Sequence, residues 1–326
     1  MEGYFVGIDI GKTNLRIAVT GLEPNFKYFA KKAYRRSCAN EMQEQITEAV
    51  EEALREGAIP SSLLAGIGIC VPAIVSRPDG TIQFGPDFES LKGHSLNQFL
   101  YQRYKVPVAA DIDTVVATWG ENWVGTGRTC NRFALITWGT GVGAGLVLDG
   151  KVYEGPNNLF AEFGHSVVSD DDWPCKCGAV GCLDSLASGT GIAEHARRAL
   201  LSGRKTILRD LCENQPETLT CPMVFEAAEE NDPVALGILE RVAVLLGRLA
   251  SNLVYTIQPE KIVIVGGLAE RAEWILDTMR NTMQSQCWLI FRGFTHCDIL
   301  PSTLGDTAGV LGAIRMVQLK TNNGNA

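Results

Sequence analysis

Apolar residues recur along the chain as short strand-like runs and as longer stretches with helical spacing. The first run, residues 4–20, predicts two apolar strands joined by a Gly-containing turn. Later runs predict buried strands at 65–70, 106–110 and 261–265. Helical spacing predicts helices over 41–56, 94–104, 113–123, 189–201, 222–228, 233–255 and 306–319. Strands that alternate with helices imply an α/β protein with mixed sheets.

The first strand pair has a second copy in the middle of the chain. Residues 5–20 align without a gap to residues 133–148, so that Phe5 meets Phe133 and Val19 meets Val147. A hairpin repeated at the start of each half indicates two similar α/β domains. We expect a small domain over 1–112, to which 306–326 return, and a larger one over 113–305.

Composition agrees with two domains, because 326 residues at about 150 per domain suggest that number. With 46% hydrophobic and 20% charged residues, the chain can build two cores, which excludes disorder as its main state. It has no apolar run of about 18 residues and no basic leader, so we expect a soluble cytoplasmic protein without membrane contact. The net charge of −8 argues against nucleic-acid binding. The basic cluster 31–36 is interpreted as a solvated strand edge.

Two glycine-rich turns are candidate phosphate sites. The segments 9–13 and 139–143 present backbone N–H groups without side-chain obstruction, and Thr13 and Thr140 add hydroxyl donors. Asp9 could hold the hydration shell of a Mg²⁺ ion. Neither turn is a Walker A loop, and such turns also occur in hairpins that bind nothing.

The ten cysteines are unevenly distributed. Seven are scattered, while Cys175, Cys177 and Cys182 lie close together and follow His165. Zinc favours four such ligands in a closed tetrahedral site, which leaves no position for catalysis. A disulfide is not expected in a reducing cytosol, and the alternative is a loop of unliganded cysteines.

Asp113 is the candidate general base. It comes where a predicted strand passes into a helix, where a carboxylate can cap free N–H groups and is favoured in its ionised form. A plain N-cap is the simpler interpretation. An ionised carboxylate at the mouth of a cleft is also what deprotonation of a hydroxyl requires.

Together and in this order, these motifs resemble the ROK family of bacterial sugar kinases, which has the actin/hexokinase-like (ribonuclease H-like) fold. The resemblance covers nearly the whole chain. Residues 162–165 are similar to the family's Glu-x-Gly-His signature, and 304–309 are similar to its closing motif. The cysteine pattern matches the family's zinc motif, with His165 as fourth ligand. The residues that the resemblance assigns to ATP are Asp9, Gly11, Lys12, Thr13, Gly139, Thr140, Gly141, Gly266 and Gly267.

The resemblance implies ATP-dependent phosphorylation of a sugar hydroxyl, most often O6 of an aldohexose; N-acetylhexosamines are the other candidate substrates. Asp113 would take the proton, and Mg²⁺ would accompany ATP. The residues implied at the sugar are Asp87, Glu162, His165 and Asp184. Closure of two domains would exclude water, and a homodimer is expected.

Four positions depart from the family's pattern. Ile112 and Val115 stand where the family usually has Asn, while Asp87 replaces Asn and Asp184 replaces Glu. The lost amide at Ile112 puts a standard glucose site in doubt. Residues 71–76 look more like the family's allose kinases than its glucokinases.

Two other functions remain open. The family's repressors carry a winged helix-turn-helix ahead of the kinase-like part, for which the position of Asp9 leaves no room. A sugar-binding protein without catalysis is the second alternative, against which the retained Asp113 argues.

Overall fold

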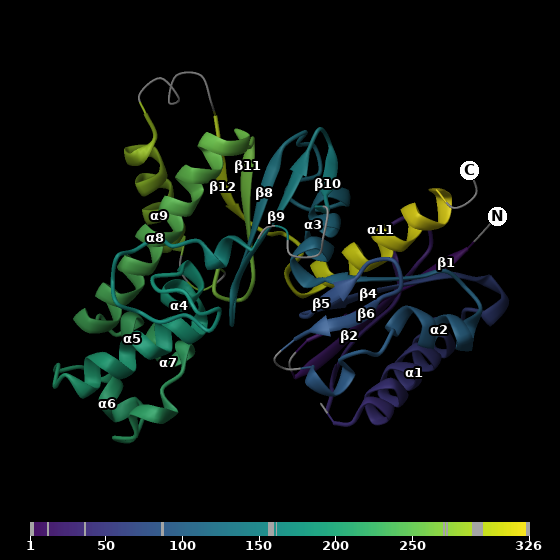
Figure 1. Cartoon of the computed structure of the whole chain (residues 1–326), viewed down its shortest axis with the longest axis horizontal. Helices are drawn as coiled ribbons and strands as arrows, with labels where there is room; N and C mark the ends of the chain where they lie inside the picture. Colours follow the sequence, from purple (N-terminus) through teal and green to yellow (C-terminus); the bar gives the residue numbers. More distant parts are fainter. Residues whose placement is uncertain are drawn as a thin grey trace.

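Two mixed five-stranded sheets organise the molecule (Figure 1). The computed structural model describes residues 3–11, 13–35, 37–85, 88–155, 160, 162–269, 271, 273–288 and 296–323. The first sheet has the order β3 (Phe26–Ala33), β2 (Asn14–Thr20), β1 (Tyr4–Ile10), β4 (Leu64–Val71), β7 (Val108–Ile112). The second has the order β10 (Lys151–Tyr153), β9 (Val142–Leu148), β8 (Phe133–Trp138), β11 (Lys261–Val265), β12 (Asp298–Pro301).

The two sheets have the same topology. In each, three antiparallel strands are followed by two strands parallel to the first. Mixed sheets in an α/β chain, as the sequence predicts, are therefore confirmed. A separate antiparallel pair, β5 (Ile74–Ser76) and β6 (Thr81–Phe84), follows β4.

The hairpins correspond, but the gapless alignment is wrong in their second strands. Phe5 pairs with Thr20, whereas Phe133 pairs with Val147, so Thr20 and not Val19 is the counterpart of Val147. The turn after β8 is one residue shorter than the turn after β1, because Trp138 already pairs with Val142. The one-residue shift between the two second strands arises in the glycine-rich turns, where the backbone tolerates a change of length.

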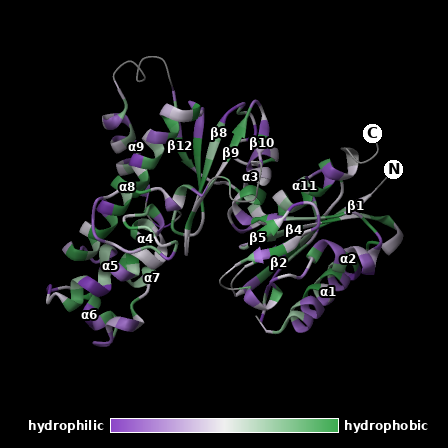
Figure 2. Ribbon diagram, viewed as in Figure 1, coloured by the Kyte–Doolittle hydropathy of each residue, from purple (hydrophilic) through white to green (hydrophobic). Residues whose placement is uncertain are grey.

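Helices account for most of the remaining described residues. They are α1 (Ala39–Glu56), α2 (Leu96–Tyr104), α3 (Asp113–Trp123), α4 (Leu183–Ala187), α5 (Gly189–Leu201), α6 (Leu208–Leu211), α7 (Cys221–Glu229), α8 (Pro233–Ile257), α9 (Glu273–Gln286) and α11 (Ala308–Asn323). Hydrophobic colour is concentrated on the strands, while α1 and α2 show polar outer faces (Figure 2). No helix of the described part is both long and apolar enough to cross a bilayer.

The last helix, α11, packs against β1, β4 and α3 (Figure 1). Glycines permit this close packing: a Cβ at Gly68 would lie 1.9 Å from the Ala313 carbonyl oxygen, and one at Gly312 would lie 1.7 Å from that of Val116. The end of the chain thus returns to its first sheet. The domain boundaries at 112/113 and 305/306 stay a prediction.

The sequence misses several elements and displaces others. The strands and helices additional to those predicted are β3, β5, β6, β10, β12, α4, α6 and α9. β7 begins at Val108 and not at Val106, because the intervening proline has no N–H for the ladder. Lys31 and Lys32 of the basic cluster lie on β3, at the edge of the first sheet, as expected.

Candidate active site

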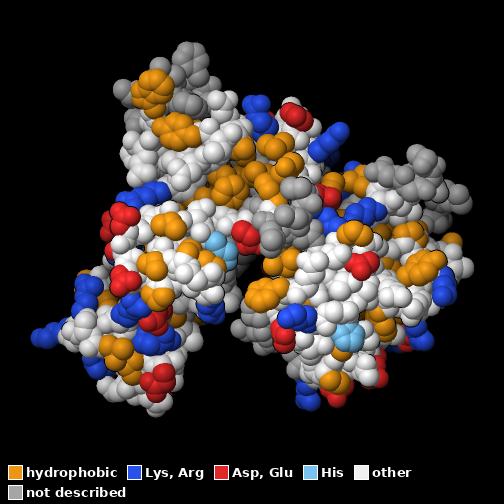
Figure 3. Space-filling model, in the orientation of Figure 1, with side chains coloured by type: hydrophobic (Ala, Val, Ile, Leu, Met, Phe, Trp, Pro, Cys, Tyr) orange, Lys and Arg blue, Asp and Glu red, His pale blue; other side chains and the backbone are white. Residues whose placement is uncertain are grey.

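Asp113 begins α3, the helix that joins the two halves of the molecule. α3 contacts β4 and β7 of the first sheet and β8, β9 and β10 of the second. The surface is hollowed between the halves (Figure 3). Asp113 Oδ1 accepts a hydrogen bond from the Thr114 N–H at 2.8 Å. The strand-to-helix position expected for this carboxylate is therefore confirmed, and its role as a base stays a prediction.

Asp113 is half-buried and lies near other acids. Burial raises the pKa of Asp113 to about 7; the Thr114 N–H opposes this shift, and the negative charges of Asp9 and Glu162 add to it. The charge interactions show that acids from three distant segments lie near one another. A carboxylate with a pKa near neutrality is suited to take and release a proton.

Asp9 lies at the end of β1, against the start of α11. A Cβ at Gly309 would come within 2.7 Å of the Asp9 carboxyl carbon, so the glycine leaves room for this side chain. Arg16 Nη1 donates to Asp9 Oδ2 at 3.2 Å, and Arg16 Nη2 donates to Asp306 Oδ1 at 2.6 Å. Burial raises the pKa of Asp9, and the positive charge of Arg16 opposes that shift. The residues 304–309 are thus brought beside the first glycine-rich turn.

Sequence reasoning missed Arg16 and Cys70, and it placed Asp306 in the closing motif without giving it a role. In the first sheet Arg16, Asp9 and Cys70 are successive partners across β2, β1 and β4. Lys31 precedes Arg16 in this row, and its Nζ donates to Asp306 Oδ2 at 2.6 Å. The available signal is the single charged residue that interrupts each of the apolar strands β1 and β2.

The first glycine-rich turn is partly described. The Gly11 N–H donates to the Asn14 carbonyl at 2.8 Å, and Asn14 Nδ2 donates to Thr13 Oγ1 at 3.0 Å. Thr13 is exposed. Lys12, predicted to bind ATP, lies outside the described residues.

The second glycine-rich turn lies next to the Gly266–Gly267 turn. The Gly139 N–H donates to the Gly141 carbonyl at 3.0 Å, and Thr190 Oγ1 donates to the Thr140 carbonyl at 2.9 Å. Gly266 has a φ of +127°, and a Cβ there would lie 2.2 Å from the Trp138 carbonyl oxygen. Two segments predicted to bind ATP are thus brought together, with open space above Gly139 and Gly267.

Three residues predicted at the sugar lie in one neighbourhood. Burial raises the pKa of Glu162; His165 opposes the shift, and Asp184 adds to it. Asp184 Oδ1 accepts a hydrogen bond from the Val142 N–H at 2.8 Å, so this oxygen supports the second glycine-rich turn. Asp87 lies outside the described residues.

The side chains of His165, Cys175, Cys177 and Cys182 form one cluster, with their ligand atoms within 4.8 Å of one another. The Cys177 and Cys182 Sγ atoms are 3.6 Å apart. Zn–S bonds of about 2.3 Å at tetrahedral angles separate two sulfurs by about 3.8 Å, so this donor set fits zinc. The predicted gathering of these four side chains is confirmed.

Glycines shape the loop around this cluster. Gly178 and Gly181 have φ values of +94° and +76°, in the left-handed region that favours glycine. A Cβ at Gly181 would lie 2.0 Å from the Ser169 carbonyl oxygen. The loop can therefore fold back on itself and direct three thiols toward one imidazole.

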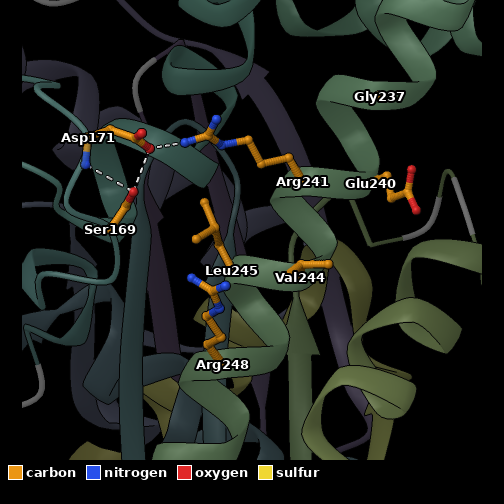
Figure 4. A pocket seen from close by; sticks show the side chains of 8 residues that line it. All are labelled: Ser169, Asp171, Gly237, Glu240, Arg241, Val244, Leu245 and Arg248. Atoms are coloured by element: carbon orange, nitrogen blue, oxygen red, sulfur yellow. Dashed lines mark hydrogen bonds and ion pairs between the residues drawn. The ribbon is translucent and has the colours of Figure 1, made fainter. Parts of the chain in front are cut away.

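A hollow of about 500 Å³ lies between α8 and the segment that joins His165 to Cys175 (Figure 4). Arg241 of α8 forms an ion pair with Asp171 across it, and Arg248 Nη1 donates to the Val168 carbonyl at 3.4 Å. These contacts hold the loop of the cysteine cluster on α8. The hollow is lined by Ser169, Asp171, Gly237, Glu240, Arg241, Val244, Leu245 and Arg248, which do not include any predicted site residue.

Comparison with known proteins connects these features. The ROK family pattern matches residues 5–320. A glucokinase of Halalkalibacterium halodurans is 30% identical over 99% of this chain and 97% of its own length. A ROK family glucokinase from Streptomyces griseus, solved in complex with glucose and AMPPNP, superposes with a TM-score of 0.81 at 28% identity, covering 97% of this chain and 100% of that one.

The proteins similar to this chain also include transcriptional repressors. A putative xylose repressor of Caldicellulosiruptor is 28% identical over 97% of this chain, which matches 78% of its length. The match to the family spans the hairpins, Asp113, the cysteine cluster and most of α11, and the solved relatives share the actin/hexokinase-like fold. The chain therefore belongs to the ROK family and has the fold of its sugar kinases.

Proposed function

We propose that this protein is an ATP-dependent sugar kinase that phosphorylates O6 of an aldohexose or an N-acetylhexosamine. The observation that carries the proposal is Asp113, a carboxylate with a pKa raised to about 7, which begins the helix that joins the two sheets and lies near Asp9 and Glu162. The glucokinase relatives support the sugar as acceptor. No nucleic acid is required by this chemistry.

In the proposed reaction Asp113 takes the proton of the sugar hydroxyl. The sugar oxygen forms a bond to the γ-phosphorus while the bond from that phosphorus to the oxygen of the ADP leaving group breaks. Mg²⁺ bound with ATP would offset the charge on the transferring group. Asp9 fits a place beside that ion, since its carboxylate is positioned by Arg16 and lies near Asp113. The predicted ATP residues of both glycine-rich turns would hold the phosphates.

The sugar would lie beside Glu162 and His165. In this proposal the His165 imidazole binds zinc through one nitrogen and is oriented by it. The Val142 N–H already occupies Asp184 Oδ1, so the remaining oxygen of Asp184 is the one that a sugar could use. Val115 is buried in the core at 2% exposure, and does not offer a side-chain hydrogen bond to the sugar. Zinc is proposed as a structural ion, and a cytoplasmic homodimer stays part of the proposal.

A sugar panel tests the function. With Mg²⁺ and ATP the protein is expected to release ADP with at least one aldohexose or N-acetylhexosamine. The 6-deoxy form of the best substrate should bind and not be phosphorylated, because it lacks the accepting hydroxyl. Turnover of that 6-deoxy sugar would reject O6. Silence across the panel with sugar binding intact would identify a sugar-binding protein without catalysis.

The rate is expected to depend on pH through Asp113. Because the base must be ionised and burial raises its pKa to about 7, kcat/KM should fall about tenfold per unit as the pH drops below 7, and level off above it. Initial rates between pH 5.5 and 9 measure this, with ATP binding followed over the same range as a control. A flat profile would contradict the assignment of the base.

A further inference from the structure

The start of α5 lies against the second glycine-rich turn. The Gly189 N–H donates to the Gly139 carbonyl at 2.8 Å, and Thr190 Oγ1 donates to the Thr140 carbonyl at 2.9 Å. The approach is close, because a Cβ at Gly189 would lie 3.0 Å from the Gly139 carbonyl oxygen. Two successive peptide groups of the turn are therefore held through their carbonyl oxygens by two successive residues of one helix.

These two hydrogen bonds determine where the N–H groups of the turn point. In a trans peptide, the form of every peptide bond in the described part of the chain, the carbonyl and the next N–H point in opposite directions. Because the Gly139 and Thr140 carbonyls point toward α5, the N–H groups of Thr140 and Gly141 point away from it. Both residues are exposed, and neither N–H has a hydrogen-bond partner among the residues that the structure describes. Two adjacent N–H groups that point outward can bind phosphate oxygens.

Only one of the two hydrogen bonds depends on a side chain. The Gly189 N–H belongs to the backbone of α5, whereas the donor to the Thr140 carbonyl is a hydroxyl. Since the Thr190 hydroxyl gives its one hydrogen to Thr140, the buried Ser188 hydroxyl, 2.9 Å away, donates to it in turn. Gly141, which follows the held peptide, has no Cβ to restrict rotation. Without the Thr190 hydroxyl, the Thr140–Gly141 peptide would therefore be free to turn over.

We propose that Thr190 is a positioning residue for ATP: its hydroxyl holds the Thr140 carbonyl away from the triphosphate and keeps the Gly141 N–H directed at it. The inference rests on the proposed kinase function, in which this turn binds the phosphates. A peptide that turned over would present a carbonyl oxygen to the negative phosphates and would lose one charge-assisted hydrogen bond. Thr190 thus acts on the affinity for the nucleotide through the turn, and takes no part in proton transfer at Asp113.

Thr190→Val tests this role, because it replaces the hydroxyl by a methyl group and keeps the β-branched shape. With Mg²⁺ present, the Kd for a non-hydrolysable ATP analogue and the KM for ATP should each rise about tenfold. By contrast, kcat and the KM for the sugar should change less than about twofold. Thr190→Ser keeps the donor and should hold both nucleotide constants within about twofold of wild type. Thr278→Val is the matched control, because the Thr278 hydroxyl also donates to a carbonyl, that of Trp274 at 3.0 Å on α9, and it should leave these constants unchanged.

A purely structural role gives a different result. If Thr190→Val lowers kcat and raises KM for both substrates alike, or if Thr190→Ser binds the analogue as weakly as Thr190→Val, the proposal is overturned. Unchanged affinity of Thr190→Val for the analogue overturns it as well. Thr190→Ala removes the hydroxyl without placing a methyl group beside Ser188, and should show the same loss of affinity if Thr190→Val does not fold. Wild type that binds the analogue but phosphorylates no sugar would reject the kinase function, while the affinity comparison would still decide the role of Thr190.

Discussion

Replacing Asp113 by Asn is expected to lower kcat about 10²- to 10⁴-fold. The amide keeps the size of the side chain and its acceptor for the Thr114 N–H, but cannot take the proton of a sugar hydroxyl. Affinities for ATP and sugar should change little. Steady-state rates and calorimetric binding measure the two effects separately. Asp277→Asn is the matched control, because that carboxylate is 62% exposed on α9, and it should leave the rate unchanged.

The same substitution should stabilise the fold at alkaline pH. The pKa of Asp113 is about 7 in the folded chain, against an ordinary value of 3.8, so the folded protein holds the proton more tightly than the unfolded chain does. The free energy of unfolding therefore falls as the pH rises above 3.8, because the folded chain must then hold this carboxylate in its ionised form, and the loss is complete above pH 7. The melting temperature of Asp113→Asn should exceed that of wild type more at pH 8 than at pH 5.5. Near-normal turnover in this variant would remove Asp113 from the mechanism.

We expect wild type to contain about one zinc ion per chain. Cys177→Ser should lower this zinc content, and it should lower the melting temperature by about 5–10 °C. The hydroxyl is a poor zinc ligand, and without the ion the loop around Gly178 and Gly181 loses its cross-link. KM for the sugar should rise more than KM for ATP, because His165 belongs to both the cluster and the proposed sugar site.

Metal analysis and thermal melts measure this prediction. Cys38→Ser is the matched control, since Cys38 is also exposed but lies outside the cluster, and it should keep both zinc and stability. Wild-type protein that contains no metal, and that melts at the same temperature as Cys177→Ser, would disprove the zinc assignment.

Features that depend on neighbouring residues could be predicted from the sequence. The strand-to-helix position of Asp113, the cysteine spacing and the repeated hairpin each lie within a short segment, where periodicity and turn chemistry determine the backbone. Even there, the sequence did not reveal that one glycine-rich turn is one residue shorter than the other. Apolar residues still match apolar residues in the gapless alignment of the second strands, although that alignment is shifted by one residue.

Contacts between particular side chains far apart in the sequence could not be predicted. Arg16 meets Asp306 across 290 positions, and Arg77 meets Gly155 across 78. Neither pair has a periodic signature, since its geometry exists only after the sheets and α11 have assembled. The hydrogen bond from the Val142 N–H to Asp184 Oδ1 likewise could not be predicted. Through it, a residue predicted to bind the sugar also supports the second glycine-rich turn.

The return of α11 to the first sheet affects how the protein folds during synthesis. β1 and β4 leave the ribosome long before α11, the helix that packs against them. Until residues 308–323 emerge, the glycine-lined face around Gly68 stays open to water, so the nascent amino-terminal half cannot complete its core. The first sheet consequently completes its packing only after the chain has been synthesised through α11.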